Sequence, residues 1–555
     1  MQSAVPRSRT TAGSGSRALY RHPGRAPERS ASSVRLSDRI RKPDVGATQR
    51  LSLGLAWRLP ARGSVVHPTP AATSVLQPLR YQRHRPDQSD LHRIIRENLD
   101  VLEPDDSSTK PPSFVRKAFA AYIDCGLLCR GFIRLACERC RANVFVAFSC
   151  KGPLCPSCGA RRMEDTTEHI MTRVLPDAAV RQWVHSLPFQ LRPRVAFDPD
   201  LFSAVVRIFI DEVFRHYARK ASSLGLRDPK SGAIAVLQRF GSTLNATPHV
   251  HVIALDGVYV RGPANSSSEP TEPELVFHEL RAPTPAEIHE VSAATCRRVL
   301  RLLQLRGITN AEGLVPIESL DPLQAVGELA ARQWPLFAEV DSDGGVHPIH
   351  AKSDWTRAGD VRGFSTDASA AASQGDTEGR RRIVRYCVRP PFAEKQVRAT
   401  ADGRVAFQLR HPRRNGATHV VFSEHAFVRR LMALVPRPYH HSVRYFGVLA
   451  SASPLRSAVV PTPPVELHLH GAAAATGIEP ASIPGAKRRA DWAILLQRIY
   501  NIDALACPKA GCGGRLRPIA AITRGDAIRK ILDHTDLDDE PPPPRTRGPP
   551  LLFAD

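Results

Sequence analysis

The sequence predicts an α+β protein, in which a small cysteine-rich domain precedes a larger domain of β-hairpins and helices. Seven of the eleven cysteines lie between residues 125 and 158, a density that in an intracellular chain favours metal ligands over disulfides. Apolar, β-branched runs bounded by turn residues recur at residues 234–260 and 405–422, with helical patterns between them. At 555 residues, the chain is long enough for two or three domains with hydrophobic cores.

Residues 1–85 are predicted to be a disordered, basic leader. They contain sixteen Arg and Lys against three acidic residues, so +13 of the net charge of +23 lies in this segment. The segment is rich in Ser, Pro, Ala and Arg and lacks the apolar core of a signal peptide. No apolar run approaches the ~18–20 residues that span a bilayer, so we expect a soluble, intracellular protein without membrane contact. The basic charge suits a polyanionic partner.

Residues 86–175 are predicted to form a zinc-binding domain that contacts DNA, with a short helix within residues 86–118. The domain contains two C-x-x-C pairs separated by fourteen residues. Four thiolates at this spacing can close one tetrahedral structural zinc site. We therefore predict that one Zn²⁺ is bound by Cys137, Cys140, Cys155 and Cys158.

Other potential ligands are not expected to form a second site. Cys125, Cys129, Cys150 and His169 would be sufficient in number for a second zinc ion, but a second site is not predicted from them. A further pair, Cys507 and Cys512, is separated by four residues and has no partners nearby in the sequence, so a complete site is not expected there. The remaining two cysteines, Cys296 and Cys387, are interpreted as small apolar residues.

A His-Val-His triplet lies in the hairpin at residues 234–260. The run 249–255 is β-branched and apolar and ends at an Asp-Gly turn, so it is a predicted buried strand. Side chains alternate along a strand, so His249 and His251 share a face about 6.5–7 Å apart, where they could bind one divalent ion while the valines pack behind. The alternative is two core histidines. A second His-Leu-His triplet, at residues 468–470, has no clear strand context.

Gln238 is the predicted third ligand of this divalent ion. It lies eleven residues before His249, on the preceding strand, and comes alongside the histidines if the hairpin pairs in the expected register. Asn245 is the competing candidate. Histidine and amide ligands with open coordination positions suit Mg²⁺ or Mn²⁺.

The remaining elements are predicted from periodicity and turn residues. The residues before the hairpin, from 176, are expected to be helical, and residues 378–388 form a helix that stops before Pro390. Strands 405–409 and 418–422 form a second hairpin. Further helices are expected at 285–305, 320–333 and 492–499, Pro-rich insertions at 260–290 and 340–377, and a linker, the cysteine pair and a disordered tail at 451–555. No phosphate loop for ATP is present.

Several motifs occur in one order along the chain: RLACERC and CKGPLCPSCGARRM, then RFGSTLNATPHVHVIALDGVYV, YCVRPPFAEKQV, GATHVVFSEHAF, LVPRP and VRYFGVLASASPLR. Together they resemble the rolling-circle transposases of the insertion sequence 91 family, over roughly residues 79–525. The resemblance implies an HUH-type antiparallel sheet with helices as the catalytic domain, at residues 176–450, behind the zinc-binding domain. In HUH enzymes a His-apolar-His strand and a tyrosine cut single-stranded DNA.

The resemblance also implies the catalytic residues. The nucleophilic tyrosine of the family corresponds to Tyr386 in RRIVRYCVRPP. The position four residues earlier is Arg382, so the first tyrosine of a Y-x-x-x-Y pair is absent, which is similar to the single-tyrosine common-region (ISCR) branch. Arg385 and Arg389 lie beside the tyrosine and could hold flanking phosphates. Asp256 is either a base for the tyrosine proton or the start of a turn.

The implied function is a transposase that nicks single-stranded DNA at transposon ends through a 5′-phosphotyrosine and transfers the strand. Its cofactors would be structural Zn²⁺ and catalytic Mg²⁺ or Mn²⁺, and its partners single-stranded DNA at the ends and target. It would be a bacterial cytoplasmic protein, at the nucleoid when bound to DNA, as a monomer or oligomer. Two alternatives remain open: a plasmid replication initiator or relaxase, and a non-catalytic zinc-dependent DNA-binding protein.

Overall fold

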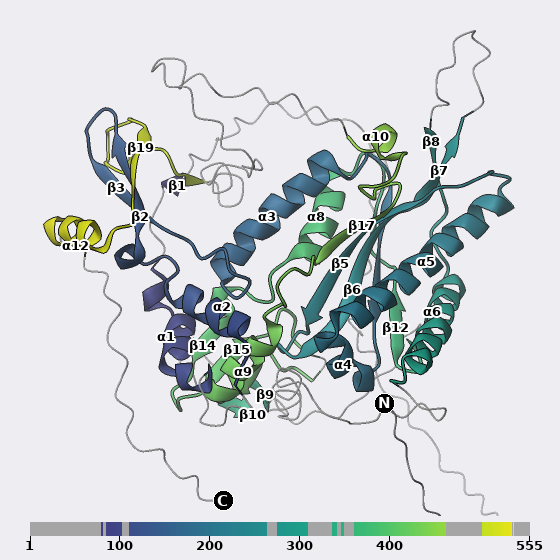
Figure 1. The fold of residues 1–555 in the computed structure, drawn as a ribbon, viewed down its shortest axis with the longest axis horizontal. Coiled ribbons are helices and arrows are strands. Elements are labelled where there is room, and N and C mark those ends of the chain that lie inside the picture. Colours follow the sequence, from purple (N-terminus) through teal and green to yellow (C-terminus); the bar gives the residue numbers. More distant parts are fainter. Residues whose placement is uncertain are drawn as a thin grey trace, which may run out of the picture. The chain divides into compact units, whose positions relative to one another are not determined.

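The structure is a computed structural model that describes residues 79–80, 85–102, 110–262, 275–308, 336–340, 346–348, 360–413, 415–461, 502–535 and 537. They belong to a compact unit that begins at Leu76, and they confirm the α+β class with antiparallel sheets (Figure 1). Most of the predicted leader, the second His-Leu-His triplet and the helices expected at 320–333 and 492–499 lie outside the described residues. Within these ranges, no helix is long and apolar enough to cross a membrane.

A seven-stranded sheet forms the centre of the larger domain. Its strands lie in the order β11-β12-β4-β6-β5-β17, and β13 pairs with β4. All the pairings in this sheet are antiparallel. The strands are β4 (Val180–Ser186), β5 (Gly232–Phe240), β6 (Ala246–Leu255), β11 (Asp360–Val361), β12 (Phe364–Asp367), β13 (Ala371–Ala372) and β17 (Val443–Gly447).

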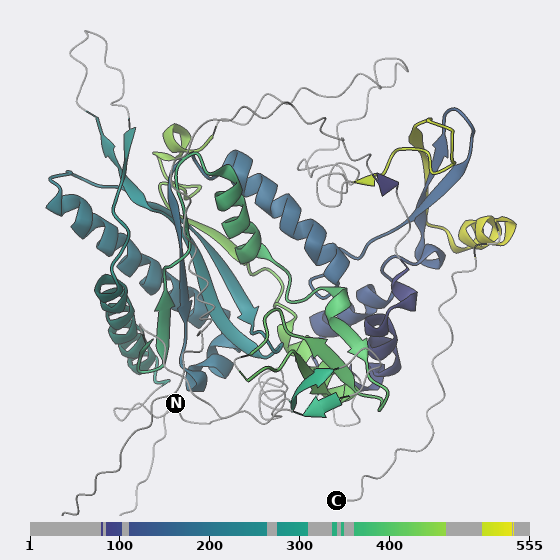
Figure 2. The same ribbon diagram turned by 180° about the vertical axis from the view of Figure 1, so that it is seen from behind.

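Helices cover both faces of this sheet (Figures 1 and 2). On one face, α5 (Pro199–Ser223) and α6 (Pro285–Leu305) pack against Val250 and Val252 of β6. On the other face, α3 (Pro156–Arg173) and α8 (Thr377–Val388) pack against Ile253 and Leu255. The alternation of β6 therefore confirms the predicted buried strand, with apolar side chains on both faces because helices shield both.

Strand β4 was not expected, because residues from 176 up to the hairpin were predicted to be helical. Its sequence, VRQWVHS, contains polar residues that are buried in the structure. Arg181 forms an ion pair of 2.7 Å with Asp256, which also accepts a hydrogen bond from the Tyr217 hydroxyl at 2.9 Å. A buried charge is stable only when it is paired, and both partners come from other elements. Asp256 therefore has a structural role in this network, as the partner of Arg181 and Tyr217. These contacts do not support the role of base that was considered for it.

His185 of β4 is a fully buried histidine on the α5 side of the sheet. Its ring stacks on Phe209 with centroids 4.5 Å apart, and its Nδ1 lies 2.9 Å from the Thr366 hydroxyl. Burial lowers the pKa of His185 to about 3. The folded protein therefore binds a proton at this group only in strong acid, whereas the unfolded chain binds one near pH 6.5.

We expect His185 to make folding less stable as the pH falls from 6.5 towards 3, because the unfolded chain binds more protons in this window. Between pH 7 and pH 5 the loss from this residue is about 2 kcal/mol. In His185→Gln, the free energy of unfolding, measured with urea, should therefore fall by about 2 kcal/mol less between pH 7 and pH 5 than in the wild type. Substitution of the exposed His440 by glutamine is the matched control. If the pH dependence of stability in His185→Gln equals that of the wild type, His185 is not the group that is buried in its neutral form.

A second sheet has five strands, which come from residues 336–348 and 397–422. It has the order β10-β9-β16-β15-β14, and its β15–β16 pairing confirms the predicted hairpin. Helices α1, α2 and α9 share its hydrophobic core. The elements are α1 (Asp90–Glu97), α2 (Ser113–Ile123), β9 (Leu336–Val340), β10 (Val346–Pro348), β14 (Val397–Ala399), β15 (Val405–Gln408), β16 (His419–Phe422) and α9 (Glu424–Leu434).

The cysteine-rich region contains a three-stranded sheet in the order β19-β2-β3. Strands β2 (Phe132–Cys137) and β3 (Asn143–Ala147) form a hairpin, and β19 (Leu516–Ile522) pairs with β2 from the far end of the chain. Helix α12 (Gly525–His534) follows β19. The region predicted as linker, cysteine pair and tail thus contributes a strand and a helix to the zinc-binding domain, because β2 offers it an edge.

The remaining elements are short. Strands β7 and β8 pair as a ribbon, so part of the predicted Pro-rich insertion at 260–290 is a strand, and β1 pairs with β18. The bounds are β1 (Leu79–Arg80), β7 (Gly257–Arg261), β8 (Leu275–Glu279), β18 (Ile502–Asp503), α4 (Arg192–Phe197) and α10 (Arg456–Val459), with 3₁₀ turns at Pro86–Gln88, Leu99–Leu102, Leu128–Arg130, Phe189–Leu191 and Glu394–Gln396.

Candidate catalytic site and cysteine centres

The two histidines of the triplet lie side by side on β6, between β4 and β5. Their ring centroids are 4.9 Å apart. The register pairs His249 with Ser186 of β4 and with Gln238 of β5. The β5–β6 hairpin therefore aligns Gln238 with the histidines, as expected. All three side chains lie on the α8 side of the sheet.

Each histidine has one ring nitrogen held by a neighbour. His249 Nδ1 lies 2.8 Å from the Thr247 carbonyl, to which it donates, so its Nε2 carries a lone pair. His251 Nδ1 accepts a hydrogen bond of 2.7 Å from the side-chain Nε2 of Gln182. The His251 Nε2 is buried without a hydrogen-bond partner in the described part of the chain. A half-turn of the Gln182 amide would set its oxygen against Nδ1 and leave a free lone pair on that Nε2. Such orientation by a second group is typical of metal-binding histidines.

Both histidines are neutral near pH 7. Burial, with smaller contributions from the neighbouring His249 and Arg389, lowers the pKa of His251 to about 3. Burial also lowers the pKa of His249 to about 4, with smaller contributions from Arg389 and Arg192. A neutral imidazole is the form that binds a metal ion.

Gln238 adds an oxygen to this pair. Its Nε2 donates to the Cys387 carbonyl of α8 at 2.5 Å, while its Oε1 is buried without a partner among the described residues. The competing candidate, Asn245, accepts a hydrogen bond from the Thr243 hydroxyl at 3.0 Å within the hairpin turn. Two imidazole nitrogens and one amide oxygen, two of these atoms buried without partners, fit a hard divalent ion such as Mg²⁺ or Mn²⁺.

Helix α8 brings Tyr386 to the histidines. The Tyr386 ring stands nearly perpendicular to that of His251, at 84° and 5.5 Å between centroids, and the side chain is 47% exposed. The helix ends here because Arg389 takes an extended backbone before Pro390, as predicted. The Arg389 guanidinium carbon lies 4.5 Å from the centroid of the tyrosine ring.

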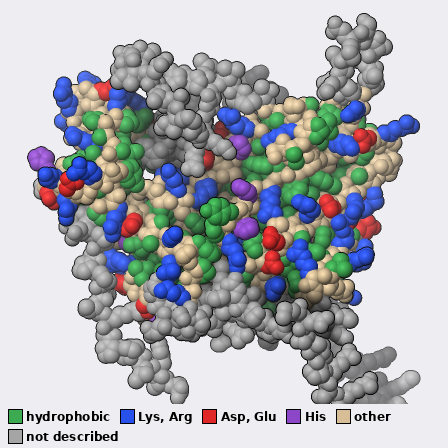
Figure 3. Space-filling model, in the orientation of Figure 1, with side chains coloured by type: hydrophobic (Ala, Val, Ile, Leu, Met, Phe, Trp, Pro, Cys, Tyr) green, Lys and Arg blue, Asp and Glu red, His purple; other side chains and the backbone are tan. Residues whose placement is uncertain are grey.

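Arginines without acidic partners surround this site. Burial lowers the pKa of Arg389 and of Arg410, the latter to about 10 with a further contribution from Arg389. Burial also lowers the pKa of Arg192, which lies close enough to affect His249. None of the three forms an ion pair with a described carboxylate. Arg385 differs, because it pairs with Glu164 of α3 at 2.5 Å. Figure 3 shows Lys and Arg side chains spread over a face that also exposes histidines.

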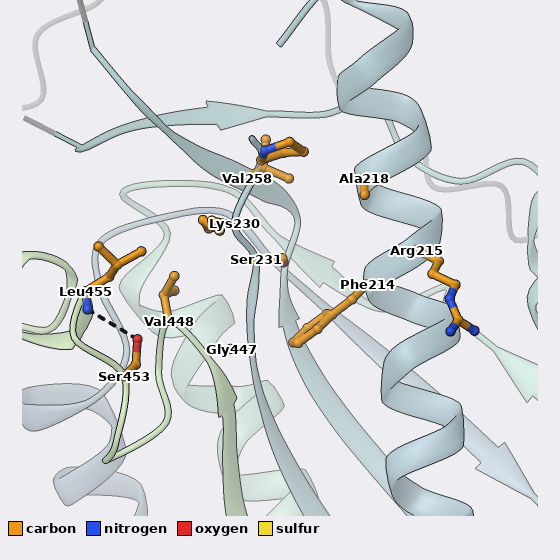
Figure 4. Close-up of a pocket in the computed structure, with 11 residues that line it drawn as sticks. Phe214, Arg215, Ala218, Lys230, Ser231, Val258, Gly447, Val448, Ser453 and Leu455 are labelled. Carbon is orange, nitrogen blue, oxygen red and sulfur yellow. Dashed lines mark hydrogen bonds between the residues drawn. The ribbon is translucent and has the colours of Figure 1, made fainter. Parts of the chain in front are cut away.

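Two aromatic residues of the sheet strands, Tyr259 and Phe240, pack against core residues. Tyr259 is 7% exposed and packs on Phe277 at 5.2 Å between centroids. Phe240 packs against the core of the second sheet and contacts Arg389 at 5.8 Å. The apolar pocket between α5 and β17 (Figure 4) is lined by neither the histidines nor Tyr386, so it is not part of this site.

The prediction of one zinc site from four cysteines is wrong, because those residues lie in two clusters. Cys155 and Cys158 join Cys125 and Cys150, whereas Cys137 and Cys140 join Cys507 and Cys512. In each cluster all four sulfur atoms lie within 4.8 Å of one another. Cys137 and Cys140 lie at the turn of the β2–β3 hairpin, whereas Cys155 and Cys158 lie at the start of α3. Cys129 and His169 belong to neither cluster.

The first cluster draws its ligands from separate elements of the zinc-binding domain. The Cys125 sulfur lies 3.8 Å from that of Cys155 and 3.7 Å from that of Cys158, and the Cys150 sulfur lies 3.7 Å from that of Cys158. Such a tetrathiolate arrangement fits structural Zn²⁺. Sequence spacing missed it because Cys125 and Cys150 precede the C-x-x-C pair at different distances.

Two family models match the chain. The one described as "Transposase zinc-binding domain" matches residues 94–187, which include the whole first cluster. The one described as "Putative transposase" matches residues 232–456, which include Gln238, His249, His251 and Tyr386. No curated protein and no solved structure matches the chain.

Proposed function

Because the chain belongs to the insertion sequence 91 family of transposases, we propose that it is an HUH-type nuclease and strand transferase acting on single-stranded DNA at transposon ends. The observation that supports this most directly is the contact of Tyr386 with His251, with 5.5 Å between ring centroids. It places a half-exposed hydroxyl-bearing side chain beside a buried set of metal-ligand atoms. A nucleophile next to a metal site is what phosphoryl transfer to a protein side chain requires.

Three residues would hold the divalent ion: His249 and His251 through Nε2, and Gln238 through Oε1. A bound Mg²⁺ or Mn²⁺ would offset the charge that develops on the scissile phosphate. Gln182 and the Thr247 carbonyl position the imidazoles by holding their Nδ1 atoms. Gln238 also donates a hydrogen bond to the Cys387 carbonyl, which links the proposed third ligand to the helix that carries Tyr386.

In the proposed cleavage step, the Tyr386 hydroxyl oxygen attacks the scissile phosphorus. The hydroxyl proton leaves the tyrosine as the Oη–P bond forms, and the P–O3′ bond breaks, so the 5′-phosphate of the downstream fragment is joined to the tyrosine. The departing 3′ oxygen of the upstream fragment takes a proton and becomes a free hydroxyl. A later attack by a 3′-hydroxyl on the phosphotyrosine transfers the strand, and the phosphodiester energy is conserved throughout without ATP.

A single tyrosine serves this chemistry. Arg382 occupies the position one helical turn before Tyr386 on the exposed part of α8, where a second nucleophile would lie in two-tyrosine relatives. Completion of two strand transfers therefore requires either a second subunit or release of the first intermediate by water. This keeps the chain close to the single-tyrosine common-region branch in its expected mechanism.

Arg389 is the proposed phosphate contact nearest the nucleophile. Its side chain lies over the Tyr386 ring, and its Nε is buried without a hydrogen-bond partner among the described residues. A desolvated guanidinium without a carboxylate is suited to bind phosphate. Arg410 and Arg192 would extend this contact, whereas Arg385 is partly engaged by Glu164.

In Arg389→Gln we expect single-strand binding to weaken by roughly tenfold, because one charge-assisted phosphate contact is lost. The slope of log K against log salt should fall by ~0.7, the value for one phosphate on a single strand. Fluorescence anisotropy at several salt concentrations measures both quantities. Arg301→Gln, on α6 at the opposite face of the sheet, is the control. An unchanged salt slope in Arg389→Gln would remove Arg389 from the interface.

The function is tested by incubating the full chain with end-labelled single strands from the DNA that flanks its gene, with Mn²⁺ or EDTA. A metal-dependent covalent adduct on one strand, joined to the 5′-phosphate of the fragment downstream of a single cut, is the expected result on a denaturing gel. DNA binding without any adduct would favour the non-catalytic alternative. Cutting at a plasmid origin rather than at element ends would favour the replication initiator.

A further inference from the structure

We propose that Cys137, Cys140, Cys507 and Cys512 form a second structural zinc centre, which clasps the C-terminal segment to the zinc-binding domain. The matched family domain ends at residue 187, so two of these four ligands lie outside it. Cys140 and Cys507 are separated by 367 positions in the sequence. The centre is independent of the nuclease chemistry proposed above.

The sulfur positions fit a tetrahedral ion. The Cys137 sulfur lies 3.7 Å from that of Cys512, and the Cys140 sulfur lies 3.6 Å from that of Cys507. Four sulfurs at the usual Zn–S length of ~2.3 Å stand roughly 3.8 Å apart in a tetrahedron. Three of the four cysteines are buried and Cys140 is partly buried, so the thiolates are shielded as structural centres require. The first cluster has the same spacing.

The backbone brings the two pairs face to face. Strand β19 pairs with β2 in a register that sets Leu516 opposite Cys137, and Arg139 donates to the Cys512 carbonyl at 2.7 Å. Gly514 lies between the pairs, where an added Cβ would be 2.6 Å from the Cys137 sulfur. Only glycine allows the two cysteine pairs to approach this closely. The two pairs are thus positioned by hydrogen bonds that the sequence spacing could not reveal.

The apolar contacts around the centre are few. Its hydrophobic cluster consists of Leu135, Cys137, Val146, Cys507, Cys512 and Leu516. Helix α12 adds Ile528 and Leu532 against Leu128 and Phe132. A core of this size supplies little folding free energy, and small modules of this kind depend on metal binding to fold. We infer that zinc holds residues 502–535 on the domain.

Metal analysis of the full chain, purified without added metal, tests the second centre. We expect two zinc ions per chain, one in Cys512→Ser and one in Cys158→Ser. Cys296→Ala, in which the substituted cysteine is buried but belongs to neither cluster, should keep two. One zinc ion per chain in the unsubstituted protein, or iron in place of zinc, would overturn the proposal without depending on how any variant folds.

The clasp is tested with a specific protease sequence inserted between residues 461 and 502 of the full chain. After cleavage, the C-terminal fragment should co-elute with the rest of the protein on gel filtration and separate when a chelator is added. In Cys512→Ser it should separate without a chelator, whereas in Cys158→Ser it should remain bound. Retention of the fragment after zinc removal would show that strand pairing suffices, and would refute the clasp.

Discussion

Substitution of Tyr386 by phenylalanine is expected to abolish the covalent protein–DNA adduct, while single-strand binding stays within about twofold of wild type. The change removes only the hydroxyl oxygen that would bond to phosphorus. The aromatic ring remains, so its contacts with His251 and Arg389 are kept. Loss of a nucleophile lowers the chemical rate by roughly 10³-fold or more, without a comparable loss of substrate binding. A denaturing gel and anisotropy measure the two properties separately.

Tyr439→Phe is the matched control for this experiment. Tyr439 is 99% exposed, so its hydroxyl can be removed without disturbing the core, and the adduct should form at the wild-type rate. If Tyr386→Phe still forms the adduct, another residue is the nucleophile. If Tyr386→Phe loses binding as well, the hydroxyl itself contributes to DNA recognition, and the rate comparison must be made at saturating DNA.

Substitution of His251 by glutamine is expected to lower the rate of strand cleavage by about 10³-fold, or about 4 kcal/mol in the activation barrier. His251 supplies a buried ring nitrogen without another partner in the described chain, so no neighbouring group can replace it as a ligand. The variant should also need more Mn²⁺ for half-maximal cleavage. Cleavage rates over a series of Mn²⁺ concentrations measure both effects.

His185→Gln is the control, because His185 is a buried histidine on the adjacent strand but on the other face of the sheet. It should alter stability in acid and leave cleavage at neutral pH unchanged. Wild-type cleavage by His251→Gln would show that the histidine pair is a core feature, as the alternative interpretation of the triplet holds. Equal losses in both variants would indicate a general effect on folding.

Local patterns determined several elements directly. The hairpins at β5–β6 and β15–β16 follow from β-branched runs and turn residues, and the end of α8 follows from Pro390, because these preferences act over a few residues. The shared face of His249 and His251 follows from the alternation of a strand. The family resemblance, not the pattern, identified Tyr386.

Only the tertiary structure decided which groups meet. Strand β4 has a polar sequence, and it can be buried because Asp256, itself hydrogen-bonded by Tyr217, pairs with the charge of Arg181. Gln182 of the same strand forms a hydrogen bond with His251. The cysteines were divided between two centres because β19 returns to pair with β2. The physical reason is common to both cases: a local sequence pattern records what a residue prefers over one or two turns, whereas burial, pairing and ligand sharing depend on elements that packing brings together from distant parts of the chain.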